Sequence, residues 1–373
     1  MNYRILVTGG AGFIGSHTVD ALIHKGHEVR ILDALTKPVH LFAKPKYVNK
    51  EAEFIKGDIR NKSLLERSLK HIDVIYHFAA YQDYLPNFST YFDVNASGTA
   101  LIYEIIVEKK LPIKKVIVAS SQAIYGEGKY RCKNGHFIYP TLRNTEDLLK
   151  KKWDVICPND GLPLTPQWVK ENDPIDPHNQ YAISKYSEEK IALHLGKRYG
   201  IPSVAMRYSI VQGPRQSPFN LYSGALRIFV TSLLADRDAT IFEDGKQLRD
   251  FVNIFDVVKA NLLVLENSKT AYQTYNVGGG RKWTIMEFYR KVRHILKSDM
   301  KPVMNGKFRV GDTRHIISDI GKIRKVGFSP KYSIDDSILT YTEWVQTLPN
   351  FKKMLAKSQE TLKTQGFIRQ SDK

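Results

Sequence analysis

Cysteine is scarce in this sequence, because only Cys132 and Cys157 occur among its 373 residues. Two cysteines are too few for the disulfide framework of a small secreted protein. No apolar run reaches the roughly 18 residues that a transmembrane helix needs. The first residues resemble a strand rather than the apolar segment of a secretory signal. We therefore expect a cytoplasmic protein with no membrane partner.

Acidic residues are in the minority. The chain contains 56 Lys and Arg against 38 Asp and Glu, which gives a formal net charge of +18. Such an excess of positive charge can favour binding to nucleic acid, to an anionic membrane or to an anionic small molecule. The basic residues are densest in 129–152 and 352–373, and no nucleic-acid-binding motif accompanies them. We expect no nucleic-acid partner and interpret the charge as a solvated surface that attracts an anionic substrate.

A glycine-rich loop follows the first apolar run. Residues 8–15 read Thr-Gly-Gly-Ala-Gly-Phe-Ile-Gly. Such glycines make the turn out of a strand and let the backbone approach a pyrophosphate, with the N-terminal amides of the next helix facing the phosphates. Asp33 ends the second apolar run about 20 residues later, where an acid binds the adenosine ribose and repels a 2′-phosphate. The pattern predicts NAD as the cofactor.

Short β-branched runs alternate with helical patterns in the first part of the chain. Strands are expected at residues 4–8, 29–33, 53–55, 74–78 and 115–119, and helices at 14–25, 63–69, 96–108 and from about 179. Such alternation is typical of βαβ units. The predicted fold class is therefore α/β, with a Rossmann-type doubly wound parallel sheet and a smaller C-terminal α/β domain that binds the substrate.

The predicted domain boundaries follow changes in this pattern. Residues 1–208 form the NAD-binding Rossmann domain, which contains an insertion at 128–172. Residues 209–348 form mainly the substrate-binding domain, and about 240–277 of them return to the Rossmann sheet. Residues 349–373 form a basic tail, expected to be helical or frayed.

Tyr181 and Lys185 lie four residues apart and therefore share one face of the predicted helix. A phenol, with a pKa of about 10, is a poor base at neutral pH until a nearby cation stabilises its phenolate. Ser121 follows a central strand at the end where open α/β sheets bind ligands. The spacing of Tyr181 and Lys185 alone would also fit two surface residues. Together with the glycine-rich loop it indicates a nicotinamide cofactor held against a tyrosine base.

These motifs resemble the extended short-chain dehydrogenase/reductase family, and within it the NAD-dependent nucleotide-sugar epimerases and dehydratases. The resemblance covers about residues 3–345 and is strongest for the branch of the dTDP-L-rhamnose 4-epimerases and UDP-sugar 4-epimerases. Further segments that carry it are 57–60, 77–80, 94–99, 207–208, 213–216, 249–252, 275–278 and 309–312.

The resemblance implies roles for individual residues. Ser121 matches the catalytic hydroxyl, Tyr181 the base, and Lys185 its modulator and a ribose ligand. The residues implied in cofactor binding are Gly9, Gly12, Phe13, Ile14, Gly15, Asp33, Asp58, Ile59, Phe78, Ala79, Ala80, Asn95, Tyr181 and Lys185. Those implied in binding the nucleotide-diphosphate sugar are Gln82, Ser121, Gln122, Arg249, Arg309 and Asp312.

Two arginines suit a diphosphate because their forked donors match phosphate oxygens in pairs. The resemblance also implies a homodimer that packs through the helix at residues 96–108 and the helix that carries Tyr181.

Departures from the family favour one reaction. Dehydratases carry Asp-Glu directly after the catalytic hydroxyl, and UDP-glucuronate decarboxylases carry Glu two positions past it, where this chain has Gln122 and Ala123. Ile210 replaces an Asn with which many relatives bind the substrate, which hints at a less polar sugar such as a 6-deoxyhexose. We therefore expect a 4-epimerase with tightly bound NAD that acts on a UDP- or dTDP-linked hexose or 6-deoxyhexose.

Two alternatives stay open. One is a reductase or dehydrogenase of a nucleotide-linked 4-keto sugar. The other, from a different class, is a non-catalytic NAD-dependent binding protein for RNA or an anionic polymer.

The separation of Ser121 from Tyr181, 60 residues, exceeds that in compact relatives and implies the insertion. The insertion contains Cys132, His136, Cys157 and Asp160. Cys, His and Asp are all competent zinc ligands, so a structural zinc is one hypothesis. A former metal site or two unrelated free thiols is the other.

Overall fold

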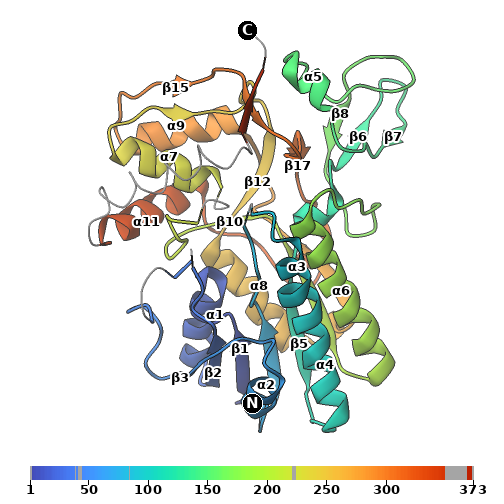
Figure 1. Ribbon diagram of the computed structural model, residues 1–373, viewed down its shortest axis with the longest axis vertical. Coiled ribbons are helices and arrows are strands. Elements are labelled where there is room, and N and C mark those ends of the chain that lie inside the picture. The colour runs from blue at the N-terminus through green and yellow to red at the C-terminus, as the bar shows by residue number, and fades with distance from the viewer. Residues whose placement is uncertain are drawn as a thin grey trace.

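The computed structural model describes residues 2–37, 39–40, 44–83, 85–220, 224–348 and 368–371. A seven-stranded parallel sheet forms the lower half of the molecule in Figure 1. Its strands, in sheet order, are β13 (Gln273–Val277), β9 (Ser203–Tyr208), β5 (Lys115–Ser121), β4 (Val74–His77), β1 (Arg4–Thr8), β2 (Glu28–Asp33) and β3 (Glu53–Lys56). The strand order reverses between β1 and β4, and open α/β sheets bind ligands at such a point.

Helices cover both faces of this sheet because successive strand residues point to opposite sides. In β1, Ile5 and Val7 belong to one apolar core, whereas Leu6 belongs to the other. The first core is covered by α1 (Phe13–His24) and α8 (Ile254–Glu266), and the second by α2 (Lys62–Ser68), α4 (Gly98–Glu108) and α6 (Gln180–Tyr199). The doubly wound α/β fold predicted from the sequence is confirmed.

A second layer of elements lies above the carboxyl edge of this sheet (Figure 1). Its small sheet contains β10 (Ile210–Gln212), β12 (Leu248–Asn253), β14 (Lys282–Thr284) and β17 (His315–Ile316). This layer has an apolar core of its own, the third in the molecule, which includes side chains of α7 (Ala225–Leu234), α9 (Ile285–Ile295) and α11 (Ile334–Gln346). Two further strand pairs are β11 (Ala239–Thr240) with β15 (Pro302–Val303), and β16 (Lys307–Arg309) with β18 (Ile368–Gln370).

The segment between β5 and α6 forms an arm of its own. It carries a three-stranded antiparallel sheet of β7 (Phe137–Ile138), β6 (Lys129–Arg131) and β8 (Thr165–Gln167), and the short helix α5 (Thr145–Leu149). Figure 1 shows this arm beside the second layer, above α6.

Shorter elements complete the described chain. They are α3 (Phe88–Tyr91), the π-helix Phe92–Ser97, the 3-10 helices Gln122–Tyr125 and Ser268–Thr270, and α10 (Gly321–Arg324).

The basic tail differs from the expectation where the structure describes it. Residues 349–367 and 372–373 lie outside the described residues. Within the described part, Ile368–Gln370 is a strand that pairs antiparallel with β16, not a helix or a frayed end. The reason is that β16 offers backbone groups to which a strand can pair, a long-range contact that local composition does not reveal.

No helix in the described ranges is both long and apolar enough to cross a membrane. The predicted domain boundaries stay a prediction.

Candidate active site

The glycine-rich loop between β1 and α1 lies where backbone segments nearly touch. Gly9 has a φ of +68°, and a Cβ on it would lie 2.6 Å from the Ala79 nitrogen. A Cβ on Gly15 would lie 2.2 Å from the Gly9 oxygen. Both separations are too short for a real side chain, so only glycine fits. Helix α1 has no side-chain N-cap and no acidic residue in its first turn, which leaves its N-terminal amides for an anion.

A cavity of about 740 Å³ extends from this loop into the second layer. Most of the predicted site residues line it: Gly9, Gly12, Phe13, Ile14, Gly15, Asp33, Asp58, Ile59, Phe78, Ala79, Ala80, Gln82, Ser121, Gln122, Tyr181, Lys185, Arg249, Arg309 and Asp312. They come from both layers, so the cavity extends across the boundary between the Rossmann sheet and the second layer. The structure therefore gathers these residues, and their individual roles remain predictions.

Among the residues predicted to bind the cofactor or the substrate, Asn95 does not line this cavity. It is fully buried, accepts a hydrogen bond from the Tyr81 nitrogen at 2.7 Å, and donates to the Tyr81 oxygen at 3.1 Å and to Ser184 Oγ at 2.9 Å. Asn95 thus ties the loop after β4 to α6. The role that the structure supports is to hold the cavity wall in place.

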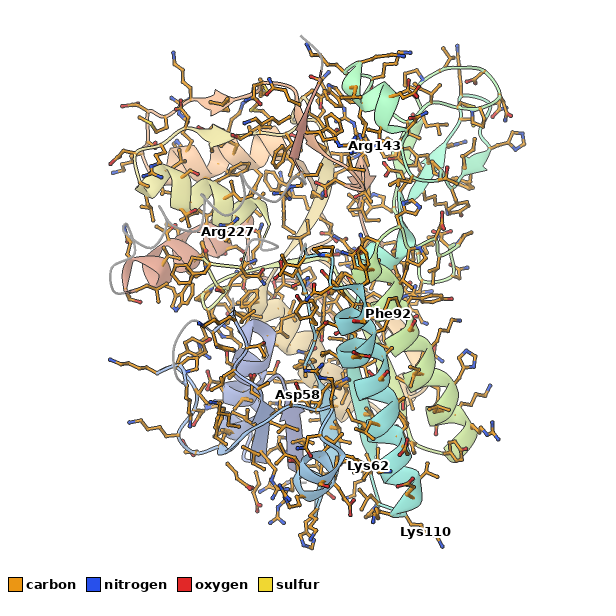
Figure 2. All side chains as sticks on the ribbon, viewed as in Figure 1. Asp58, Lys62, Phe92, Lys110, Arg143 and Arg227 are labelled. Atoms are coloured by element: carbon orange, nitrogen blue, oxygen red, sulfur yellow. The ribbon has the colours of Figure 1, made fainter. Side chains whose placement is uncertain are left out.

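Two carboxylates stand at the cavity end beside the glycine-rich loop. Asp33 Oδ2 accepts from the Ala11 nitrogen at 3.0 Å, and its Oδ1 accepts from the Leu35 nitrogen at 2.8 Å. Asp58 is held by Arg60 through contacts of 2.7 to 3.2 Å, which lower the pKa of Asp58. Figure 2 shows Asp58 in the lower, Rossmann half of the molecule. Asp33 ends its strand with its carboxylate oriented by the glycine-rich loop, which suits ribose hydroxyls.

Ser121 and Tyr181 meet at the carboxyl end of β5. Ser121 Oγ accepts from the Ala123 nitrogen at 3.1 Å and starts the 3-10 helix. Tyr181 lies in the first turn of α6, whose N-cap is Asn179. Burial and the charge of Glu188 raise the pKa of Tyr181, whereas a hydrogen bond from Ser121 lowers it. The phenol is thus a weak acid at rest, and it shares a hydrogen bond with the Ser121 hydroxyl.

Lys185 lies one turn beyond Tyr181 and bonds a carboxylate that the sequence motif does not include. Its Nζ donates to Glu188 Oε2 at 2.5 Å, and both side chains are almost wholly buried. Burial raises the pKa of Glu188 to about 7, although Lys185 opposes that shift. Glu188 could have been found from its spacing, because a residue three positions after Lys185 lies on the same helix face.

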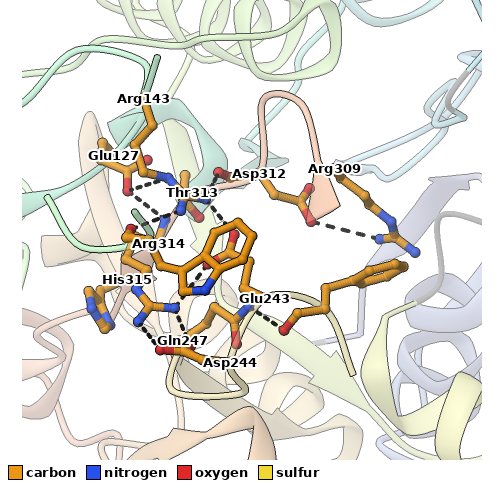
Figure 3. A network of polar contacts seen from close by, with 12 residues as sticks. Glu127, Arg143, Glu243, Asp244, Gln247, Arg309, Asp312, Thr313, Arg314 and His315 are labelled. Carbon is orange, nitrogen blue, oxygen red and sulfur yellow. Dashed lines mark hydrogen bonds and ion pairs between the residues drawn. The ribbon is translucent and has the colours of Figure 1, made fainter. Parts of the chain in front are cut away.

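The two predicted diphosphate ligands stand in the upper wall of the cavity. Arg249, on β12, donates from Nη1 to the Leu248 and Arg314 oxygens and from Nη2 to the Thr313 oxygen, at 2.7 to 3.0 Å. The Arg309 guanidinium lies 4.6 Å from the centre of the Phe242 ring and 4.0 Å from Asp312 (Figure 3). Arg249 is thus held by three backbone carbonyls, and the Arg309 guanidinium makes a cation–π contact with Phe242.

A buried charge network attaches the arm to this wall (Figure 3). Arg314 is fully buried and bonds Asp154, Glu243 and Asp244 at 2.7 to 3.2 Å. Arg143, in the arm, donates to Glu243 at 2.8 Å and to the Asp312 oxygen at 2.7 Å. The arm therefore fixes the turn that carries Asp312, a function that the sequence did not indicate.

The zinc hypothesis was wrong. The Cys132 and Cys157 sulfurs lie 3.0 Å apart and both side chains are buried, but His136 and Asp160 are exposed. Asp160 accepts a hydrogen bond from the Leu162 nitrogen at 3.0 Å, so its carboxylate completes a local turn. No group of three metal-ligating side chains occurs in the part of the chain that the structure describes. The arm is held by its own small core of Tyr130, Cys132, Val155, Cys157 and Leu164.

The fold and the site define an enzyme that binds a nicotinamide dinucleotide across the carboxyl edge of its sheet. The chain belongs to the NAD dependent epimerase/dehydratase family, which matches residues 5–143 and 160–278. The resemblance to the extended short-chain dehydrogenase/reductase family is thereby confirmed.

Several relatives span nearly the whole chain. The dTDP-L-rhamnose 4-epimerase of Burkholderia thailandensis is 28% identical and aligns with 92% of this chain and 94% of its own. The UDP-glucose 4-epimerase of Thermotoga maritima, solved with UDP-glucose, is 30% identical with a TM-score of 0.76, over 92% of this chain and 98% of that one.

The UDP-glucuronic acid 4-epimerase of Bacillus cereus was solved with UDP-glucuronic acid and NAD. It is 27% identical with a TM-score of 0.73, over 93% of this chain and 100% of that one. A decarboxylase and a dehydratase also match this chain, so membership of the family leaves the reaction open.

Proposed function

We propose that this chain is a nucleotide-sugar 4-epimerase that uses tightly bound NAD. The observation that carries the proposal is the position of Ser121, Tyr181 and Lys185 on one cavity, between the glycine-rich loop and the two arginines. The cavity fits the cofactor, because a Cβ would fill the glycine-rich loop and the amides of α1 have no side-chain cap. Similarity to three 4-epimerases supports the same conclusion.

NAD, when bound, supplies the hydride acceptor and donor at C4 of the sugar. Ser121 holds the sugar oxygen, and Tyr181 removes the hydroxyl proton as that carbon becomes a ketone. Lys185 stabilises the phenolate while Tyr181 waits to return the proton. Arg249 and Arg309 hold the diphosphate, so the 4-keto sugar can turn within the cavity and present its other face. The reaction inverts C4 without net redox change.

The wall next to Ser121 disfavours dehydration. Gln122 is buried, and its Oε1 accepts from Ser318 Oγ at 3.2 Å. Ala123 also lines the cavity, and neither residue carries an acid that could expel a hydroxyl from the neighbouring carbons. A single alcohol oxidation therefore matches this wall better than elimination.

We propose a UDP- or dTDP-linked hexose or 6-deoxyhexose as the substrate. Ile210 lines the cavity, and its apolar side chain would face a bound sugar. A buried sugar hydroxyl that faces Ile210 would lack a hydrogen-bond partner, which is costly. A sugar with one hydroxyl fewer avoids this cost.

The test is proton NMR of the enzyme with NAD and a panel of UDP-, dTDP-, GDP- and CDP-sugars, with absorbance of reduced nicotinamide followed in parallel. A new anomeric signal without steady change in absorbance supports epimerisation and names the substrate. Stoichiometric turnover of the cofactor would instead establish a reductase or dehydrogenase. Silence across the panel would favour a sugar outside the panel or the non-catalytic binding protein.

We also propose a homodimer that packs through α4 and α6. Leu101, Ile191 and Leu195 are only partly buried on these helices, whereas Ile105 is fully buried within the chain's own core. Apolar side chains left half-covered on two neighbouring helices suit a helical interface. Light scattering after size exclusion tests this proposal, and a monomer would contradict it. The cytoplasmic location stays a prediction.

A further inference from the structure

Glu188 is a buried carboxylate for which the proposed reaction has no use. It bonds Lys185 Nζ at 2.5 Å, and its side chain is 0% exposed. Tyr181, Lys185 and Glu188 lie at positions i, i+4 and i+7 of α6, and therefore on one face of the helix. The carboxylate thus contacts the cation that the tyrosine needs, from the same face of the helix.

The groups around Glu188 leave Lys185 as its counter-ion. Tyr103 of α4 and Tyr208 of β9 face it, and neither is a cation. Its neighbour Glu189 on α6 repels it and is neutralised by Arg207, whose Nε lies 2.9 Å from Glu189 Oε2. Glu188 and Lys185 therefore form a pair of their own.

A buried histidine within reach of the charge of Lys185 is itself uncharged. His77 of β4 bonds Thr8 Oγ1 at 2.7 Å and Thr99 Oγ1 at 3.0 Å. Burial and the charge of Lys185 lower the pKa of His77 to about 3. Because His77 is neutral, it adds no charge beside Lys185, and Glu188 remains the charged group bonded to that ammonium.

The ion pair with Lys185 satisfies only one of the two oxygens of this carboxylate. Glu188 Oε1 has no hydrogen-bond partner among the described residues, and a half-bonded buried carboxylate is unfavourable. Burial raises the pKa of Glu188 to about 7. The negative charge of Glu188 also raises the pKa of Tyr181, against the Ser121 hydrogen bond. The charge of Glu188 therefore acts on Tyr181 as well as on Lys185, to which it is bonded.

We propose that Glu188 is a positioning residue that holds the Lys185 ammonium on the Tyr181 face of α6 and attenuates the positive charge that Tyr181 experiences. The inference rests on the proposed function, in which Tyr181 is the base. When Glu188 is ionised, the pair is neutral and Tyr181 loses its proton less readily. When Glu188 takes up a proton, the charge of Lys185 acts on Tyr181 unopposed. The two ionisations oppose each other, so the rise of activity with pH is shallower than that of one isolated base.

The test replaces Glu188 by Gln, which keeps the shape and an acceptor oxygen but removes the charge. The tyrosinate absorbance of each protein is titrated and that of its Tyr181→Phe counterpart is subtracted, so that Tyr181 alone is observed. We expect Glu188→Gln to lower the pKa of Tyr181 by about one unit, and to move the rise of kcat/KM to lower pH by the same amount. Glu104→Gln, an exposed charge on α4, should change neither.

A second pair of variants separates positioning from structure. If Glu188 acts on Tyr181 through Lys185, adding Glu188→Gln to Lys185→Met should change the pKa of Tyr181 much less than Glu188→Gln does in the wild type. The double variant buries neither charge and keeps the test readable if Glu188→Gln alone is unstable.

An unchanged pKa in Glu188→Gln, or an equal change with and without Lys185, would overturn the inference. The titration needs no substrate, so an enzyme with another activity would still give a clear answer on Glu188.

Discussion

The hydroxyl groups of Ser121 and Tyr181 share a hydrogen bond, although 60 residues separate them in the sequence. Ser121 ends β5, and α6 packs beside that strand with Tyr181 in its first turn. The chain between them forms the arm, which leaves the sheet after β5 and returns at α6 (Figure 1). The insertion therefore lengthens the chain without separating the two hydroxyls.

Replacing Tyr181 by Phe should abolish most of the epimerase activity, because the phenolic oxygen is the proposed base. The expected loss in kcat is about 10²- to 10⁴-fold, with the content of bound NAD unchanged. Tyr186→Phe is the matched control, since Tyr186 lies on the same helix outside the cavity lining. Retention of near-normal kcat in Tyr181→Phe would remove Tyr181 from the mechanism.

Replacing Asp33 by Asn should weaken NAD binding by about tenfold or more, because a charged acceptor is lost at the proposed ribose site. The preference for NAD over NADP should shrink as well, since the repulsion of a 2′-phosphate disappears. Calorimetric titration with both dinucleotides measures these effects. Glu28→Gln, an exposed charge on the same strand, is the control. Equal affinities in wild type and Asp33→Asn would place the ribose elsewhere.

Replacing Arg309 by Ala should raise KM for the nucleotide sugar by about tenfold or more and weaken binding of the free nucleoside diphosphate equally. The reason is the loss of a guanidinium that faces the cavity along the Phe242 ring. Lys301→Ala removes an exposed charge from the same layer and controls for net charge. A change in kcat with constant KM would contradict a role in binding the diphosphate.

The contribution of Glu127 to the free energy of unfolding should fall as the pH rises. Burial raises the pKa of Glu127 to about 7, and its Oε2 has no hydrogen-bond partner among the described residues. A carboxyl whose pKa is higher in the folded than in the unfolded state stabilises the fold fully below the unfolded pKa of about 4.3. That contribution is lost as the pH rises through about 7.

The Glu127→Gln variant lacks this titration. Its Tm relative to wild type should therefore increase between pH 5 and pH 8, by about 2 °C or more. Glu146→Gln, an exposed residue of the arm, should show no such trend. A Tm difference that is constant with pH would show that Glu127 is ionised throughout.

Treatment with a metal chelator should leave Tm unchanged, because the structure does not gather Cys132, His136, Cys157 and Asp160 into one ligand set. The measurement is a thermal melt with and without chelator, together with zinc analysis of the purified chain. One zinc per chain, lost together with stability, would contradict the structure of the arm.

Much of the fold was predictable because the signals are local. Alternating β-branched runs and helical patterns located β1, β2, β4 and β5, and Asn179 marks the start of α6 as its N-cap. The glycine-rich loop was also predictable from its sequence. The structure explains its glycines, because a Cβ on Gly9 or Gly15 would clash with backbone atoms.

What escaped prediction depends on contacts between distant residues. Arg143 bonds Glu243 across 100 positions, and Arg314 bonds Asp154 across 160, so no local pattern could pair them. The strand at residues 368–370 exists because β16 is available to it. Glu188 was overlooked for a different reason: its spacing was visible, but only burial reveals that its charge opposes Lys185.

The central claim is that C4 is oxidised and then receives its own hydrogen back on the other face. The most direct test is to run the epimerisation in deuterium oxide with the sugar nucleotide found in the panel and to examine C4 of the product by NMR. We predict that C4 keeps its original hydrogen and gains no deuterium. Deuterium at C4 would show that a proton exchanges with solvent there, and it would contradict hydride transfer as the route of inversion.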